Sequence, residues 1–253
     1  MASDSEQELK GRVAIVTGAG RNIGRAIALA LASGGAAVVV NARANRAEAD
    51  AVAREIEGAG GRAVPILADV SDAAAVEDMV AEAVKHFGGI DILVNNAALR
   101  KETPLDRMTT ADWREIMAVI LDGAFHCVKA CLPHLKKSGA GTIINIGGLS
   151  AHTGATRRAH VITAKAGIVG LTRALAHDLA ADRVTVNCIA PGMIATARKA
   201  DTPEPQHHQT RATLVGRQGT PEEIANTVRF LCGPGARYIT GQLVHVNGGA
   251  FLG

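Results

Sequence analysis

The sequence predicts an α/β fold, in which one domain is built on a doubly wound parallel sheet of seven strands with helices on both faces. Two observations support this prediction. Short β-branched runs alternate along the whole chain with alanine-rich stretches of helical periodicity, as βαβ units require. The β-branched runs are also apolar on both sides of the strand, which is typical of parallel strands that helices cover on each face.

The elements follow one another in a regular order, without a linker or an internal repeat. Strands are expected at residues 13–17, 37–40, 63–67, 90–94, 142–146, 184–189 and 243–246. Helices are expected at residues 22–33, 45–58, 72–87, 110–136, 160–181 and 221–232. Asp72 and Thr220-Pro221 have the residue types that begin two of these helices.

Two stretches lack such periodicity. Residues 1–10 are polar, and we expect them to be a flexible N-terminus. Residues 194–219 carry Thr202-Pro203-Glu204-Pro205 and His207-His208, and a long irregular insertion of this kind predicts a substrate loop or lid. The two histidines lack a spaced third ligand, so no metal site is expected.

Composition excludes several classes of function. The 253 residues are 47% hydrophobic with a net charge of +3 and only six aromatic Phe, Trp and Tyr side chains, which disfavours nucleic-acid binding. The N-terminus has no apolar segment typical of a secretory signal, and the longest uncharged run, residues 26–42, is interrupted by glycines, so no membrane span is expected. The four cysteines form no CxxC motif, which favours a reducing, cytoplasmic compartment.

A glycine-rich turn follows the first predicted strand and leads directly into an alanine-rich helix. Glycines at this place let backbone N–H groups approach a pyrophosphate at the helix N-terminus, where the helix dipole favours anions. The alternative is a tight structural turn without a ligand. The position after the first strand favours a coenzyme site, with these candidate residues: Gly18, Arg21, Asn22, Ile23 and Gly24.

The end of the second strand predicts which coenzyme is bound. An acidic residue there would bind the 2′-hydroxyl of an adenosine ribose, but the sequence has Asn41-Ala42-Arg43, and the first acid is Glu48. Arg21 and Arg43 instead offer guanidinium groups to a 2′-phosphate. The alternative is two solvated arginines. NADP(H) is therefore favoured over NAD(H).

Together these motifs resemble the short-chain dehydrogenases/reductases, in particular the group similar to 3-oxoacyl-carrier-protein reductases. The resemblance extends from about Gly11 to Gly249 and implies a Rossmann-type dinucleotide-binding domain over residues 1–253. The phosphate loop is similar to TGxxxGxG, with Asn22 at the middle glycine. Asn is the residue that best tolerates the left-handed backbone after Gly. The remaining coenzyme positions that the resemblance implies are Asp69, Val70, Asn96, Ala97, Lys165, Pro191, Gly192, Ile194 and Thr196.

The catalytic positions depart from the family pattern. The resemblance implies an Asn in the long helix, a Ser after the fifth strand and a Tyr four residues before a Lys. This chain has Ile120, Gly148 and Val161 at the first three positions and retains Lys165. Loss of a general acid costs on the order of 10²–10⁴ in rate. Loss of a hydrogen-bond donor to the developing oxyanion costs about 10²–10³ more.

Two histidines are alternative proton donors. His152 lies in the loop after the fifth strand, which borders the substrate pocket in the family, and His160 precedes Val161. Imidazole titrates near neutral pH and can act as acid or base. Ordinary loop or packing roles are the alternative for both. Tyr238, the one tyrosine, leads into the last strand, where we expect a structural role.

Three functions remain open on these residues. The first is an NADP(H)-dependent oxidoreductase acting on a carbonyl/alcohol pair with a non-standard proton donor. The second is a non-catalytic member that binds coenzyme or ligand and partners an active paralogue in a mixed oligomer. The third is a lyase or isomerase that needs no coenzyme turnover.

The expected partner is a small-molecule substrate. Basic residues flank the pocket that the resemblance implies and suit an anionic substrate or are a solvated rim: Arg157, Arg158, Arg198 and Lys199. In the family, the helices that correspond to residues 110–136 and 160–181 form a tetramer interface. The resemblance therefore implies a homotetramer.

Overall fold

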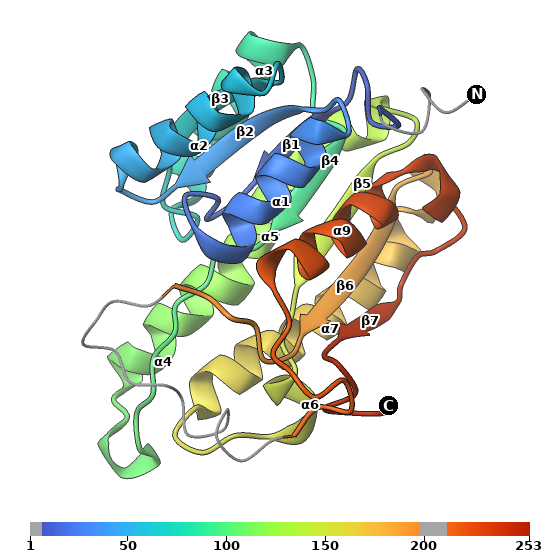
Figure 1. Cartoon of the computed structure of the whole chain (residues 1–253). Coiled ribbons are helices and arrows are strands. Elements are labelled where there is room, and N and C mark those ends of the chain that lie inside the picture. Colours follow the sequence, from blue (N-terminus) through green and yellow to red (C-terminus); the bar gives the residue numbers. More distant parts are fainter. Residues whose placement is uncertain (1–6, 198–211) are drawn as a thin grey trace.

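The structure is a computed structural model that describes residues 7–197 and 212–253. Within these residues seven strands form one sheet in the order β3-β2-β1-β4-β5-β6-β7, and all neighbours are parallel (Figure 1). This is the doubly wound, Rossmann-type sheet that the sequence predicts. The strands are β1 (Val13–Val16), β2 (Ala37–Ala42), β3 (Arg62–Leu67), β4 (Ile92–Asn95), β5 (Thr142–Ile146), β6 (Thr185–Pro191) and β7 (Leu243–Val246).

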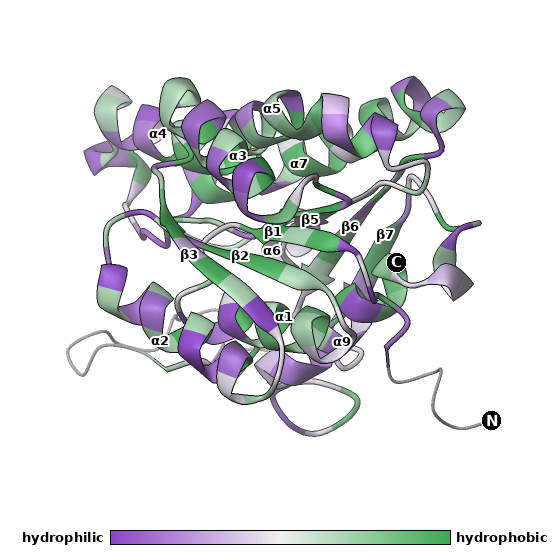
Figure 2. Cartoon of the chain, turned by 90° about the horizontal axis from the view of Figure 1, so that it is seen from above, coloured by the Kyte–Doolittle hydropathy of each residue, from purple (hydrophilic) through white to green (hydrophobic). Residues whose placement is uncertain are grey.

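Helices cover both faces of the sheet, with α1, α2 and α9 on one face and α3, α4, α5 and α7 on the other (Figure 2). The helices are α1 (Asn22–Ser33), α2 (Arg46–Gly58), α3 (Ala73–Phe87), α4 (Thr110–Met117), α5 (Gly123–Lys137), α6 (Ser150–Thr153), α7 (Ala159–Asp178) and α9 (Pro221–Cys232). Shorter turns of helix are η1 (Leu105–Arg107), η2 (Ala118–Asp122), η3 (Ala180–Asp182) and η4 (Pro234–Ala236).

The core forms because successive strand residues face opposite layers. In β1, Ala14 and Val16 pack with α1, α2 and α9, whereas Ile15 packs with α3 and α5. All three side chains are fully buried. This two-sided burial explains why the central strands carry apolar residues at every position.

Side chains begin several helices as the sequence predicts. Asp72 caps α3 by accepting a hydrogen bond from the backbone N of Ala74 at 2.9 Å. Thr220 begins α9 through a capping box with Glu223, and Pro221 is the first helical residue. Both predicted starts are confirmed, because these side chains satisfy N–H groups that lack a partner within the helix.

Three features differ from the expectation. The helix expected at 110–136 contains a π-helical turn, η2, between α4 and α5, and the helix expected at 160–181 ends at Asp178. The edge strands β3 and β7 are only partly buried, so burial on both faces is wrong for them. An edge strand has a sheet neighbour on one side only, which leaves part of it open to solvent.

The described part of the N-terminal segment is anchored to the fold. Leu9 is fully buried in the core, and the Glu8 carboxylate accepts two hydrogen bonds from Arg229 of α9, at 2.6 and 2.8 Å. This ion pair holds the pKa of Glu8 below its usual range. These contacts attach Glu8 and Leu9 to the fold, whereas residues 1–6 of the segment expected to be flexible lie outside the described residues.

Part of the predicted substrate loop also lies outside the described residues, which end at Ala197 and resume at Ala212. The predictions for Arg198, Lys199, His207 and His208 fall in this gap. In the part of the chain that the structure describes, one helical stretch, Thr110–Lys137, is long and apolar enough to cross a membrane. It comprises α4, η2 and α5, and buries Cys127, Cys131 and Leu135 against the sheet, so it is a covering helix of the fold.

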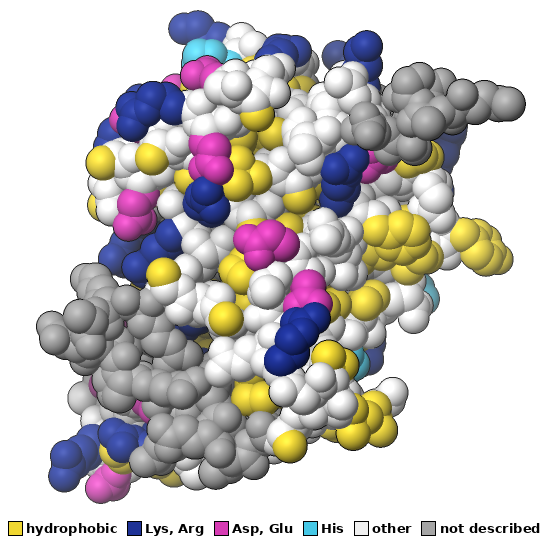
Figure 3. Space-filling view, in the orientation of Figure 1, with side chains coloured by type: hydrophobic (Ala, Val, Ile, Leu, Met, Phe, Trp, Pro, Cys, Tyr) yellow, Lys and Arg dark blue, Asp and Glu magenta, His cyan; other side chains and the backbone are white. Residues whose placement is uncertain are grey.

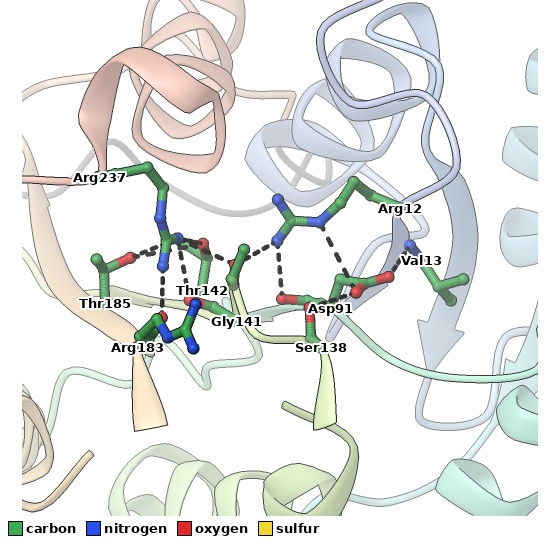
Figure 4. A network of polar contacts seen from close by, with 10 residues as sticks. Arg12, Val13, Asp91, Ser138, Gly141, Thr142, Arg183, Thr185 and Arg237 are labelled. Atoms are coloured by element: carbon green, nitrogen blue, oxygen red, sulfur yellow. Dashed lines mark hydrogen bonds and ion pairs between the residues drawn. The ribbon is translucent and has the colours of Figure 1, made fainter. Parts of the chain in front are cut away.

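A polar network ties the strands together at their amino ends (Figure 4). Asp91 accepts hydrogen bonds from the backbone N of Val13 at 2.8 Å and from the Ser138 hydroxyl at 2.5 Å. Arg12 donates to the Ala140 carbonyl at 2.7 Å, and Arg237 donates to the same carbonyl at 3.0 Å. The network lies at the edge of the sheet opposite the phosphate loop, so it stabilises the fold without entering the candidate site.

This location predicts a stability effect that leaves ligand binding unchanged. Asp91→Ala leaves a partly buried backbone N–H and a hydroxyl without their acceptor, so we expect a loss of about 2 kcal/mol in the free energy of unfolding. Asp50→Ala, which removes an exposed pair with Arg46 on α2, is the control and is expected to cost below about 0.5 kcal/mol. Urea unfolding of both variants measures the difference, and equal losses would contradict the prediction.

Candidate coenzyme and catalytic site

The phosphate loop connects β1 to α1 at the carboxyl edge of the sheet. Gly18 and Asn22 both adopt the left-handed region, with φ of 62° and 51°. A Cβ atom at Gly24 would lie 2.3 Å from the carbonyl oxygen of Gly18, closer than any side chain allows. The loop therefore needs glycine at 18 and 24, and Asn22 adopts a conformation that only a few residue types tolerate.

Side chains from neighbouring strands hold this loop in place. The Thr17 hydroxyl accepts from the backbone N of Asn96 and of Ala97, both at 3.0 Å. The Asn96 amide donates back to the carbonyls of Thr17 at 2.9 Å and Gly18 at 3.1 Å. Asn41 is buried at the end of β2, where its oxygen accepts from the backbone N of Gly18 at 3.2 Å. The structure thus places Asn41 and Asn96, both predicted as coenzyme contacts, in bonds to the loop itself.

The N-terminus of α1 fits the phosphates of a dinucleotide. Arg21 precedes the helix without a side-chain cap, and the first turn, which contains Ile23 and Gly24, has no acidic residue. Free N–H groups and the positive end of the helix dipole are the groups that bind phosphate. Arg21 and Arg43 are exposed, and neither belongs to any ion pair found among the described residues.

Two carboxylates lie near this region. Glu48 of α2 lies beside Gly20, where a Cβ atom would be 3.4 Å from the Glu48 carboxylate oxygen. This proximity could not be predicted from the position of Glu48 along the chain. Asp69, after β3, accepts from the backbone N and the hydroxyl of Ser71, at 3.0 and 2.7 Å. Val70 packs against Gly123, where a Cβ atom would lie 2.8 Å from Val70.

The segment predicted to surround the nicotinamide follows β6. The backbone N of Gly192 donates to the carbonyl of Val246 at 2.9 Å, and a Cβ atom at Gly192 would lie 2.6 Å from the backbone of Asn247. Further on, the Thr196 hydroxyl accepts from Arg100 at 3.3 Å. Pro191, Gly192, Ile194 and Thr196 therefore lie at the carboxyl edge of the sheet, as the phosphate loop does, which is where open α/β sheets bind ligands.

Lys165 of α7 is buried, and its ammonium donates to the carbonyl of Ile146 at 2.5 Å. Burial lowers the pKa of Lys165 to about 8, because desolvation disfavours the charged amine. The positive charges of Arg100 and Arg158 act in the same direction, whereas Cys188 acts against them. Lys165 is thus a buried amine with two positively charged neighbours, and its pKa of about 8 lies close to neutral pH.

The other three positions carry two buried apolar side chains and a glycine. Ile120, in the π-helical turn, and Val161 are each 3% exposed and belong to one hydrophobic cluster with Cys188. The cluster contains no hydroxyl or amide at either position. At Gly148, an added Cβ atom would meet nothing within 4 Å, so a side chain has room there.

The two candidate histidines lie in different surroundings. His152 packs edge-on against His245, with ring centroids 4.9 Å apart, and burial followed by the charges of His245 and Arg173 lowers its pKa. His160 is 0% exposed, and burial lowers its pKa as well. Both imidazoles are therefore held neutral at pH 7, which weakens them as proton donors. Tyr238 is fully exposed beside Arg237, at the opposite edge of the sheet.

A doubly wound sheet with a glycine-rich turn at an uncapped helix N-terminus defines a dinucleotide-binding protein. Comparison with known proteins identifies the family within this class. A family model described as enoyl-(acyl carrier protein) reductase matches residues 18–250. The chain is 39% identical over 240 residues to 3-oxoacyl-[acyl-carrier-protein] reductase FabG of Staphylococcus aureus, covering 94% of this chain and 98% of that protein.

Solved structures agree with the sequence comparison. A short-chain dehydrogenase/reductase from Serratia marcescens is 38% identical with a TM-score of 0.89, covering 96% of this chain and 99% of that one. A 7α-hydroxysteroid dehydrogenase in complex with NADH and 7-oxo glycochenodeoxycholic acid is 35% identical with a TM-score of 0.92, covering 98% and 97%. The chain belongs to the short-chain dehydrogenase/reductase family of oxidoreductases, as the resemblance of its motifs indicates.

The buried amine predicts how stability depends on pH. Because the pKa of Lys165 is lowered from 10.5 to about 8, the unfolded chain binds more protons than the folded chain between these pH values. The free energy of unfolding should therefore rise with pH across this window, by up to about 3 kcal/mol relative to Lys165→Met. Urea unfolding of both proteins at stepped pH measures this difference, and parallel pH profiles would contradict it.

Proposed function

We propose that the chain is an NADP(H)-dependent oxidoreductase of a carbonyl/alcohol pair whose proton donor is not a tyrosine. The observation that supports this most is the phosphate loop, which combines the left-handed turn at Gly18 and Asn22 with the uncapped N-terminus of α1. When bound, the coenzyme supplies or accepts a hydride. Arg21 and Arg43, exposed beside this loop, would bind the 2′-phosphate.

The source of the proton is the step of the proposed reaction in which this chain must differ from the family pattern. Reduction of a carbonyl gives an alkoxide that must be protonated, and Ile120, Gly148 and Val161 carry no exchangeable side-chain proton. Lys165 retains one, and at pH 7 its ammonium form predominates because its pKa is about 8. We assign proton donation to Lys165, with His152 and His160 as weaker candidates because burial holds both imidazoles neutral.

The charge around Lys165 favours an anionic substrate. Arg100 and Arg158 are close enough to lower the pKa of Lys165, so the site concentrates positive potential. A carboxylate or an acyl conjugate bearing phosphate would be attracted to it. This charge supports a small anionic molecule as the substrate. We also propose that the protein is cytoplasmic.

A second candidate function is a non-catalytic member that binds coenzyme and partners an active paralogue. The observation that favours it is the packing of Ile120 and Val161 into one apolar cluster, which leaves no polar group at two of the catalytic positions.

Exposed apolar residues support an oligomer, which we propose is a tetramer. Phe125 of α5 is 51% exposed, and apolar side chains also show beside α9, which carries Phe230 (Figure 3).

The choice of coenzyme can be tested by calorimetric titration with NADPH and NADH. We expect the wild type to prefer NADPH, and Arg43→Ala to weaken NADPH binding about 10- to 100-fold while leaving NADH binding unchanged, because a charge-assisted hydrogen bond to the 2′-phosphate is lost. Arg46→Ala is the matched control, since Arg46 is also exposed but pairs with Asp50. Equal affinity for both coenzymes would contradict the assignment to NADP(H).

Restoring the missing side chains tests the catalytic assignment. We expect Ile120→Asn, Gly148→Ser and Val161→Tyr together to raise NADPH-linked reduction of simple carbonyls at least about 100-fold, because a general acid and a hydrogen-bond donor are regained. Gly148 has room for the serine, whereas the tyrosine must displace part of the apolar cluster. Adding Lys165→Met to the triple variant is the control and should abolish the gain. A folded triple variant that binds NADPH without any gain would contradict the assignment.

A further inference from the structure

Asn22 joins two parts of the chain that are far apart in sequence. Its side-chain amide donates to the carbonyl of Ala197 at 3.2 Å, and its oxygen accepts from the backbone N of the same residue at 2.9 Å. One primary amide thus satisfies both backbone groups of one residue, 175 positions away. A glycine at position 22 would preserve the turn but could form neither bond. The side chain therefore adds a connection that the loop geometry alone does not need.

Ala197 ends a segment that is held at several points, which we call the strap (Met193–Ala197). The backbone N of Ala195 donates to the carbonyl of Gly219 at 2.8 Å, and the backbone N of Gly219 donates to the carbonyl of Met193 at 2.9 Å. Thr196 accepts from Arg100, which follows β4. The base of the strap is therefore fixed to the segment before α9, while its far end is fixed to the phosphate loop through Asn22.

The strap and the phosphate loop meet at Asn22 and Ala197, and both belong to the proposed coenzyme site. The loop offers the N-terminus of α1 to the pyrophosphate, and the strap carries Ile194 and Thr196 at the nicotinamide end. The pair formed by Asn22 and Ala197 connects these two segments. Movement of the strap away from the loop would break both hydrogen bonds.

We propose that the Asn22 side chain is a latch that retains the bound dinucleotide by fastening the strap to the phosphate loop. This role rests on the proposed function, because it requires that the site binds NADP(H). It is distinct from the contact of the loop backbone with phosphate, which a glycine at position 22 would preserve. Asn22 is thus a positioning residue whose effect is on coenzyme exchange.

The test is the rate at which NADPH dissociates, followed by nicotinamide fluorescence after a chase with excess NADP⁺. Asn22→Gly removes the side chain and keeps the left-handed turn, and Ala197→Pro removes the N–H donor from the other side. We expect each to accelerate dissociation about tenfold, as loss of one or two hydrogen bonds implies. The double variant should be no faster than the faster single variant, because both changes break the same latch. Ala197→Ser, at an exposed position, keeps both backbone groups and is the control.

Hydrogen exchange at the backbone N–H of Ala197 gives a readout that does not need coenzyme. We expect protection of this amide in the wild type and in Ala197→Ser, and its loss in Asn22→Gly. If the wild type binds no NADPH, the proposed function fails and the latch fails with it, whatever the exchange shows. If the wild type binds NADPH but dissociation from Asn22→Gly is unchanged, only the latch is overturned.

Discussion

The close approach of α1 to the end of β1 is the constraint on which the rest of the site depends. Gly24 lies so near the carbonyl of Gly18 that no Cβ atom fits between them, and this contact fixes the first turn of the helix over the carboxyl edge of the sheet. Thr17, Asn41 and Asn96 then anchor the loop to three strands. Because the loop cannot shift without breaking these bonds, the orientation of Arg21 and Asn22 follows from backbone packing.

The same constraint explains why α1 differs from its neighbours. Side chains cap α2, α3, α4 and α9, each of which begins with an Asn, Asp or Thr that accepts from the first turn. At α1 the preceding residue is Arg21, whose side chain cannot accept a hydrogen bond, and no acid lies in the first turn. α7, which follows Arg158, also lacks a side-chain cap, so α1 is distinguished by an uncapped N-terminus directly after the glycine-rich turn. Its N–H groups and dipole are available to an anion there, whereas α2, α3, α4 and α9 satisfy their own first turns.

Local patterns predicted the fold well, and tertiary contacts account for what they missed. The order of strands and helices follows from periodicity, and α1 begins and ends where the sequence predicts, because apolar spacing and turn residues decide both. The π-helical turn at Ile120 could not be predicted, since its residues have ordinary helical propensity. The ion pair between Glu8 and Arg229 could not be predicted either, because it joins residues 221 positions apart.

In the candidate site, too, local patterns predicted some features, and tertiary contacts account for those that were missed. Glycine spacing indicated the phosphate loop, and the tolerance of Asn for positive φ predicted that Asn22 would preserve the turn. The partner of its side chain could not be found from the sequence, because Ala197 has no distinctive residue type and bonds only through its backbone. Asn41 was predicted to contact the coenzyme, yet its amide bonds to Gly18 and to the carbonyl of Ala68, a role that only the packing of β2 and β3 reveals.

Lys165 is the strongest physical argument that the pocket keeps a function. A buried amine bonded to a single carbonyl among apolar neighbours disfavours the folded state below pH 8, and a methionine of similar length would pack there without that cost. Ile120 and Val161 lie in one buried apolar cluster, which would accept such a residue. A buried charged group that destabilises the fold, at a position where an apolar side chain would pack better, is typical of a functional site. The positive charges of Arg100 and Arg158 lower the pKa of Lys165 further and add to the cost of keeping its amine charged in the folded state.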